Sequence, residues 1–273
     1  MTPMVLTESL IVEKQGNIAF LKLNRPDVLN SLNRDLLTNL LKACHDLGND
    51  TQCRVVVIVG SGTKAFCAGA DLAERKGMTE GQVLDYLSLI QKTMLAVERL
   101  PQVVIAAING SAFGGGTELS LACDLRMMVE EASLRLTEVK LGIIPGAGGT
   151  QRLPRLIGKS KAKEMILTGS PISAKDAYAF GLVHRIVDAG TSGTGSYHAE
   201  LLKQAESWAR EIAANAPLAL KQAKYAIDNG FDRDLEAGLA IETKAYLQLL
   251  NTKDRLEGLQ AFAEKRSPQY TGE

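Results

Sequence analysis

The chain has 273 residues, of which 45% are hydrophobic, so it can bury a sizeable core in one large domain or two smaller ones. Its 31 Lys and Arg residues balance 31 Asp and Glu residues, which argues against a general polyanion-binding protein, since such proteins need clustered cations. No apolar run is long enough to span a bilayer and the first residues lack the pattern of a targeting peptide, so we expect a cytoplasmic protein without a membrane partner.

The first hundred residues alternate predicted strands with predicted helices. A strand over residues 18–23 is followed by a helix from about Asn33, a candidate N-cap, because leucines recur at three- and four-residue steps. A buried strand over residues 55–59 leads into a loop of small residues, GSGTKAFCAGADL, and then into a helix over residues 79–100. Strand, loop and helix thus alternate, which predicts an α/β fold with parallel strands.

The next predicted strand, residues 103–108, runs into a glycine-rich corner. Gly114, Gly115 and Gly116 allow backbone amides to approach a ligand, and amides at such a corner point toward negative charge. The short helix that follows surrounds Glu118 with apolar residues, so we expect a poorly solvated carboxylate with a raised pKa, suited to proton transfer. Glycine runs at such corners are also common structural features, so the corner alone leaves the function open.

A second acid and a second glycine cluster follow a strand predicted over residues 125–129. Glu138 precedes the run GIIPGAGG, in which Gly146 and its neighbours predict another backbone-rich corner that opens a helix. Neither cluster matches G-x-G-x-x-G or a P-loop, and no G-x-S-x-G occurs, which argues against nucleotide hydrolysis and serine-hydrolase chemistry. We interpret Asp124 and Arg126, which lie between the two acids, as a cap or a buried ion pair.

The last part of the chain is mostly helical, with one short strand over residues 183–187. Residues 190–196, GTSGTGS, have the composition of a flexible surface loop. The amphipathic helices after it need an apolar partner, which is either the sheet or another subunit. We therefore predict a core over residues 1–197 and a helical region over residues 198–273.

The cysteines and histidines form no metal or redox pattern. The four cysteines lack C-x-x-C spacing and lie in apolar contexts, so we expect buried, reduced thiols. The three histidines are far apart in the sequence, which gives a zinc site or a Cys-His nucleophile little support. The sequence therefore predicts no metal site.

Three motifs in this order resemble the crotonase family, and specifically its enoyl-CoA hydratases: AFCAGADL, FGGGTEL with CDLR, and EVKLGIIPGAGGTQRLPRLIG. The resemblance covers residues 5–273. Within the family, KLGIIPGAGGTQRLPR and TKDRLEGLQAFAEKR look closest to the branch that includes the AU-RNA-binding methylglutaconyl-CoA hydratase. The resemblance implies a crotonase-like spiral of ββα units and a C-terminal helical region that trimerises, often as a dimer of trimers. It also implies an acyl-CoA thioester as substrate, so coenzyme A belongs to the substrate and no cofactor is expected.

The resemblance also implies roles for individual residues. The amides of Ala70 and Gly115 would form an oxyanion hole that stabilises a developing enolate. Glu138 would deliver a proton to the α-carbon, and Glu118 would orient and activate the water that adds to the β-carbon. Because many family members with other activities lack one of the two acids, the pair favours a hydratase.

For the coenzyme A moiety, the resemblance implies contacts from the backbone around the first motif and beside the second glycine cluster, with further contacts from a neighbouring subunit. The residues are Ala68, Asp71, Leu72 and Gly146, with Tyr246 and Lys265 from the neighbour. Asp71 can also cap the helix after the loop through its side chain. Helix packing for Tyr246 and a solvated surface charge for Lys265 remain alternatives.

The acyl group and the function class leave alternatives open. Methylglutaconyl-CoA carries a distal carboxylate, and the basic residues nearest in sequence to the inferred site are Arg75, Lys76 and Lys140. A general short-chain hydratase acting on crotonyl-CoA is the runner-up. An RNA-binding protein and a catalytically silent scaffold are the other classes, but the first amphipathic helix carries few lysines, so nucleic acid is not an expected partner.

Overall fold

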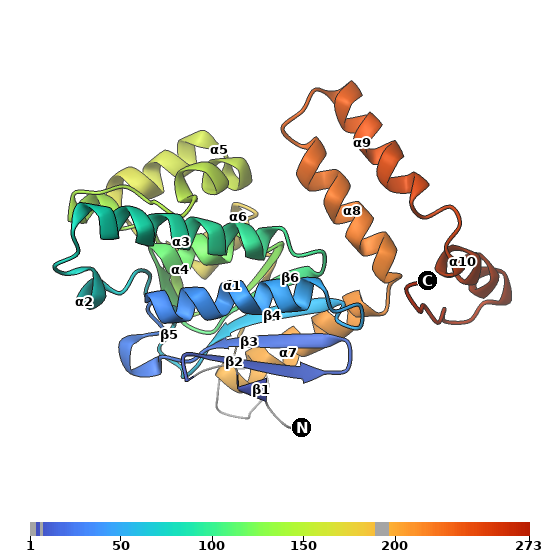
Figure 1. Ribbon diagram of the computed structural model, residues 1–273, viewed down its shortest axis with the longest axis horizontal. Helices are drawn as coiled ribbons and strands as arrows, with labels where there is room; N and C mark the ends of the chain where they lie inside the picture. The colour runs from blue at the N-terminus through green and yellow to red at the C-terminus, as the bar shows by residue number, and fades with distance from the viewer. Residues whose placement is uncertain (1–3, 6–7, 189–196) are drawn as a thin grey trace.

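The computed structural model describes residues 4–5, 8–188 and 197–273 of the chain. These residues form two β-sheets surrounded by helices, with the last helices projecting from the body (Figure 1). The loop expected over residues 190–196 lies outside them. No helix in the described ranges is both long and apolar enough to cross a membrane.

The main sheet contains seven strands in the order β1-β2-β3-β4-β6-β8-β11. Strands from β3 onward run parallel, whereas β1, β2 and β3 are antiparallel. All six residues of β4, VVVIVG, are buried, as expected for a central strand covered on both faces. The bounds are β1 (Met4–Val5), β2 (Leu10–Gln15), β3 (Ile18–Leu23), β4 (Val55–Gly60), β6 (Val103–Ile108), β8 (Leu125–Val129) and β11 (Arg185–Val187).

A second sheet of four short strands lies where the sequence indicated loops, corners and, around β10, helix. Its order is β10-β9-β7-β5, with β5 (Ala65–Cys67), β7 (Ser111–Phe113), β9 (Ser133–Arg135) and β10 (Ile172–Ser173). The expectation of a continuous loop after β4 is wrong, because β5 pairs with β7 there. Strands of two or three residues are too short to show a period in the sequence. Since β5, β7 and β9 follow β4, β6 and β8, the chain repeats a ββα unit, which confirms the predicted fold.

The two long helices of the first half of the chain are capped as their sequences predict. Helix α1 (Arg34–Gly48) begins after Asn33, whose side chain accepts the Leu36 amide, and α3 (Glu80–Glu98) begins with a capping box at Thr79. Helix α1 packs against α3. The remaining helices of the body are η1 (Pro26–Val28), α2 (Leu72–Arg75), α4 (Gly115–Leu121), η2 (Glu138–Leu141), α5 (Gly149–Thr168) and α6 (Ala174–Ala179).

The C-terminal helices divide into one helix that packs on the sheet and three that leave it. Helix α7 (Tyr197–Ala213) buries Leu201, Ala205 and Trp208 and contacts strands of the main sheet. The expected boundary at residue 197 therefore coincides with the start of a helix that lies with the core. Helices α8 (Pro217–Gly230), α9 (Leu235–Leu247) and α10 (Lys253–Glu264) form a projecting arm, called here the C-terminal arm (residues 217–273) (Figure 1).

Two groups of half-buried contacts, made by Lys224 and Arg54, fasten the C-terminal arm to the core. Lys224 of α8 places its Nζ 2.7 Å from Asp124 Oδ2 and 3.1 Å from the carbonyl of Gln102. Arg54 donates to the carbonyls of Ala213 at 2.9 Å and Tyr270 at 2.6 Å. Asp124 is thus structural, as interpreted from the sequence, and its ion-pair partner comes from the arm.

Arg126 is also structural. Its guanidinium is buried and donates to the carbonyls of Ser120, Cys123, Asp124 and Leu182. It therefore joins the end of α4 to the segment before β11 through backbone carbonyls, while the carboxylate of Asp124 pairs with Lys224.

Candidate active site

Glu118 lies on the first turns of α4 with only 2% of its surface exposed. Its Oε1 accepts two backbone hydrogen bonds from the second glycine cluster, from the amides of Ala147 at 2.8 Å and Gly149 at 2.7 Å. The pKa of this carboxyl is raised to about 7, mainly by burial and also by the charge of Glu138, against the lowering effect of the two amides and Arg152. The expected raised pKa is present, and its main cause is loss of solvent.

Glu138 reaches the same place from η2. The backbone at Gly114 has φ 49°, and a Cβ built there would lie 2.8 Å from Glu138 Oε1, so the carboxyl rests directly against the first glycine corner. The Oε2 atom of Glu138 is buried without a hydrogen-bond partner in the described part of the chain. Burial raises the pKa of this carboxyl as well. The structure therefore brings together two acids that are twenty residues apart in the sequence.

Beside the two acids lie two backbone amides, those of Ala70 and Gly115, called here the amide pair. Leu32 donates to the carbonyl of Gly69 at 2.7 Å and accepts from the amide of Asp71 at 3.0 Å. In a parallel bridge of this kind, the N–H of the intervening residue points to the other side, so the N–H of Ala70 faces away from Leu32. The Ala70 nitrogen lies 3.6 Å from where a Cβ on Gly115 would be.

Apolar side chains lie next to Gly115 and Gly146, and no sequence motif pointed to them. A Cβ on Gly115 would meet Leu32 and Ile90 side chains at 3.3 and 3.4 Å, and one on Gly146 would meet Leu87 at 2.7 Å. Leu87 and Ile90 stand three residues apart on α3, which is the spacing of one helix face. That spacing was visible in the sequence, but it is equally typical of core packing.

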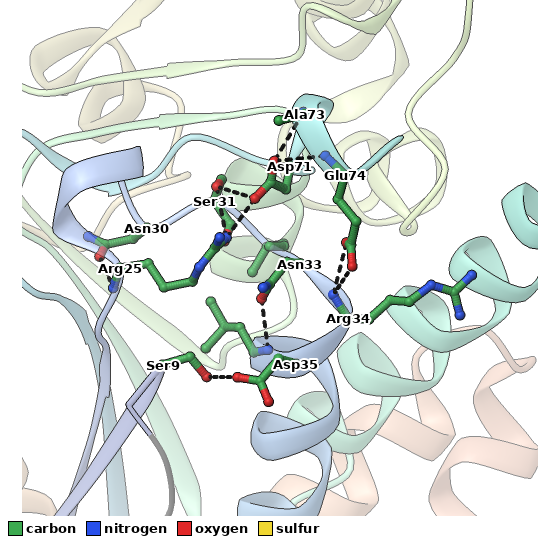
Figure 2. Close-up of polar contacts among 12 residues, drawn as sticks. Ser9, Arg25, Asn30, Ser31, Asn33, Arg34, Asp35, Asp71, Ala73 and Glu74 are labelled. Carbon is green, nitrogen blue, oxygen red and sulfur yellow. Dashed lines mark hydrogen bonds and ion pairs between the residues drawn. The ribbon is translucent and has the colours of Figure 1, made fainter. Parts of the chain in front are cut away.

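The loop that carries Ala70 is held by Asp71, as Figure 2 shows. The Asp71 carboxylate accepts from Arg25 at 2.8 Å and from the amides of Ala73 and Glu74, so it caps α2 as expected. The pKa of Asp71 is lowered, because the hydrogen bonds from Arg25 and the cap amides outweigh burial. Its side chain is therefore committed to the fold.

Two backbone N–H groups of this loop already donate hydrogen bonds within the fold. The amide of Ala68 donates to Leu29 at 2.9 Å, and that of Asp71 donates to Leu32. A ligand contact from the backbone of either residue would therefore use a carbonyl oxygen rather than an N–H. Leu72 begins α2 with an exposed side chain.

The three basic residues singled out in the sequence lie in different surroundings. The Arg75 guanidinium lies 5.7 Å from the centre of the buried Tyr86 ring, whose hydroxyl donates to the carbonyl of Leu32 at 2.6 Å. Arg75 is thus three contacts from the amide pair, through Tyr86 and Leu32. Lys76 is exposed, and the Lys140 side chain lies against Gly169 at the end of α5.

Tyr246 and Lys265 are not brought to the acids within one chain. Tyr246 lies on α9 with 61% of its surface exposed, and Lys265 ends α10 with φ 54°. Both belong to the C-terminal arm, which projects away from α4 (Figure 1). Any contact of theirs with a ligand at this site would have to come from another copy.

The geometry combines a buried and a half-buried carboxyl group with the amides of Ala70 and Gly115, for which the described residues offer no backbone acceptor. An acid with a raised pKa can exchange a proton near neutral pH, and two convergent N–H groups can stabilise an oxygen that gains negative charge. Among residues 4–5, 8–188 and 197–273, no group of His, Cys, Asp and Glu side chains could hold a metal ion.

Known proteins resemble this chain over nearly its full length. The family model described as enoyl-CoA hydratase/isomerase matches residues 13–273. Mitochondrial methylglutaconyl-CoA hydratase from Homo sapiens is 44% identical over 96% of this chain and 76% of its own length. Mitochondrial enoyl-CoA hydratase domain-containing protein 2 from Bos taurus is 43% identical over 94% of this chain and 85% of its own. The crystal structure of an enoyl-CoA hydratase from Bacillus anthracis matches with a TM-score of 0.92 and 52% identity, covering 97% of this chain and 100% of that one.

The buried charge of Glu118 predicts a pH-dependent change in stability. Because its pKa rises from 4.5 to about 7 on folding, its contribution favours the folded state at low pH and is lost as the pH rises through 7. Glu118→Gln mimics the protonated form, so it should raise the unfolding midpoint at pH 8.5, and the gain should shrink toward pH 5. Thermal unfolding at fixed protein concentration measures this, with exposed Glu164→Gln as control. An equal gain at both pH values would contradict a buried, ionisable carboxylate.

Proposed function

Since the chain belongs to the enoyl-CoA hydratase/isomerase family, we propose that it is a hydratase, which adds water across the 2,3 double bond of a short or branched enoyl-CoA thioester. The observation that supports this most is the convergence of Glu118 and Glu138 beside the amide pair. Hydration needs a base for water and an acid for the enolate, and the site contains two carboxyl groups for these tasks.

In the proposed reaction, the thioester carbonyl accepts hydrogen bonds from the amides of Ala70 and Gly115. The ionised Glu118 takes a proton from water as the water oxygen bonds to the β-carbon, and the electrons of the double bond move onto the thioester oxygen. The amide pair stabilises this enolate. Glu138, whose pKa is raised by burial, then gives its proton to the α-carbon. A proton then passes from Glu118 to Glu138, directly or through solvent, which resets the site.

We propose methylglutaconyl-CoA as the preferred substrate. The chain is 44% identical to a human protein named for that substrate. The distal carboxylate of that substrate needs a cation. Of Arg75, Lys76 and Lys140, Arg75 has contacts leading toward the amide pair, through Tyr86 and Leu32. A partly desolvated charged hydrogen bond there would contribute about 1.5 to 3 kcal/mol.

We further propose assembly as a trimer or a dimer of trimers through the C-terminal arm. The arm exposes large apolar side chains, among them Phe231, Leu235 and Phe262, the last with 87% of its surface exposed. Apolar area of this extent on one chain indicates a surface that another chain covers. In such an assembly, Tyr246 and Lys265 of a neighbour would contact the nucleotide end of coenzyme A, while Ala68, Asp71, Leu72 and Gly146 would line its path.

The two acids are tested by conservative substitution. Glu118→Gln and Glu138→Gln should each lower kcat by roughly 10² to 10⁴ fold, because each removes a positioned proton-transfer group. Binding of the product ester should largely survive. Loss of absorbance of the conjugated thioester measures kcat, and calorimetric titration measures binding. A single variant that keeps wild-type turnover would refute the role of its residue.

The acyl preference is tested by comparing two thioesters. Wild-type kcat/KM should be higher for methylglutaconyl-CoA than for crotonyl-CoA, and Arg75→Met should lower only the former, by about ten to a hundred fold. Lys76→Met, a neighbouring exposed lysine, serves as the matched control. A higher wild-type kcat/KM for crotonyl-CoA would identify a general short-chain hydratase and leave the two-acid mechanism in place.

The assembly is tested by native mass spectrometry at micromolar concentration, where species in multiples of three are expected. Phe231→Glu together with Phe262→Glu should shift the population toward monomer, because charges would be buried in the apolar contact. A wild-type protein that is only monomer or dimer would rule out the proposed trimer.

A further inference from the structure

The glycine cluster that binds Glu118 is itself held by charged side chains that the proposed mechanism does not use. We propose that Arg152, locked by Glu98, is a positioning residue that fixes the Glu118 carboxylate through the backbone of Ala147 and Gly148. This inference rests on the proposed role of Glu118 as the base that activates water. It adds an ion pair between α3 and α5 to the machinery of that base.

The geometry begins with the two amides that bind Glu118. They belong to Ala147 and Gly149, and the peptide unit between Ala147 and Gly148 separates them. Arg152 Nη1 donates to the Ala147 carbonyl of this peptide unit at 2.9 Å. The guanidinium therefore anchors the peptide unit that joins the two amides.

Gly148 provides the space for this contact. It has φ 111°, and a Cβ on it would lie 2.0 Å from Arg152 Nη1, so only glycine allows the guanidinium to lie against the chain. The backbone amide of Arg152 also donates to the carbonyl of Gly148 at 2.8 Å. Side chain and main chain of Arg152 thus bind consecutive carbonyls of the cluster.

Glu98 fixes the guanidinium from the other side. Its two carboxylate oxygens accept from Arg152 Nε at 2.9 Å and Nη2 at 2.7 Å, which is a bidentate arrangement. The Arg152 side chain is 13% exposed and that of Glu98 is 38% exposed, so the pair lies at the edge of the core. Helix α3 adds a second restraint, since Gln91 donates to the carbonyl of Gly146 at 2.8 Å.

The charges around Glu118 give this arrangement a distinctive electrostatic consequence. Glu138 of η2 raises the pKa of Glu118, and Arg152 of α5 lowers it. Glu98 of α3 partly neutralises Arg152 from behind. Removing Arg152 therefore favours protonated Glu118, which cannot act as a base, whereas removing the charge of Glu98 does not.

The test compares Arg152→Gln, Arg152→Lys and Glu98→Gln in hydration kinetics across pH. Arg152→Gln should lower kcat at pH 7 by about ten to a hundred fold with little change in KM, the scale expected when a catalytic group is displaced. The acidic limb of its pH profile should move to higher pH. Arg152→Lys should keep the acidic limb at a pH near that of wild type but recover only part of kcat. Glu98→Gln should lower kcat without moving the acidic limb to higher pH. The matched control is Arg155→Gln, on the same helix as Arg152. It breaks an exposed ion pair between Arg155 and Asp232.

A second measurement does not depend on activity. The gain in unfolding midpoint from Glu118→Gln at pH 8.5 should be larger in the Arg152→Gln background than in wild type, because the ionised carboxylate has lost its cation there. Equal gains, together with an unmoved acidic limb, would overturn the proposal. Absence of hydration in wild type, or full activity of Glu118→Gln, would instead refute the proposed function. The comparison of unfolding midpoints would still decide whether Arg152 acts on Glu118.

Discussion

Withdrawal of the Glu118 carboxylate from water is the constraint on which the rest of the site depends. A carboxylate with 2% exposure is costly unless it is hydrogen-bonded, and here one oxygen receives the amides of Ala147 and Gly149. Those amides are available because the second glycine cluster turns back over α4. The cluster is held in turn by Arg152, so the acid, the turn and the ion pair form one connected unit.

The same arrangement explains why backbone groups carry so much of the site. Strands β5, β7 and β9 are parallel neighbours, so the segments that leave them emerge at one edge of the small sheet. The corner after β5 presents Ala70, the corner after β7 presents Gly115 and Glu118, and the segment after β9 presents Glu138. Repetition of one ββα unit therefore gathers an amide pair and two acids from segments nearly seventy residues apart.

Sequence periodicity predicted the long elements well, since β4, β6, α1 and α3 bury enough apolar residues to show a strand or helix pattern. It missed the small sheet, whose strands have two or three residues. It also missed Arg152 and Glu98, because a surface helix commonly carries such charges. Their importance follows from one contact, between Arg152 and the Ala147 carbonyl, that depends on how α5 meets α3.

The sequence by itself determined the α/β class, the caps of α1 and α3, the family resemblance, and both acids with their glycine corners. These features are local, because a cap, a period or a motif is encoded within a few neighbouring residues. Only the tertiary structure decided that Asp124 pairs with Lys224 of the C-terminal arm, that Asp71 binds Arg25, and that the Ala70 nitrogen lies beside Gly115. Each of these depends on which distant segments meet, and the free energy that brings them together comes from burying the whole core rather than from the residues in contact.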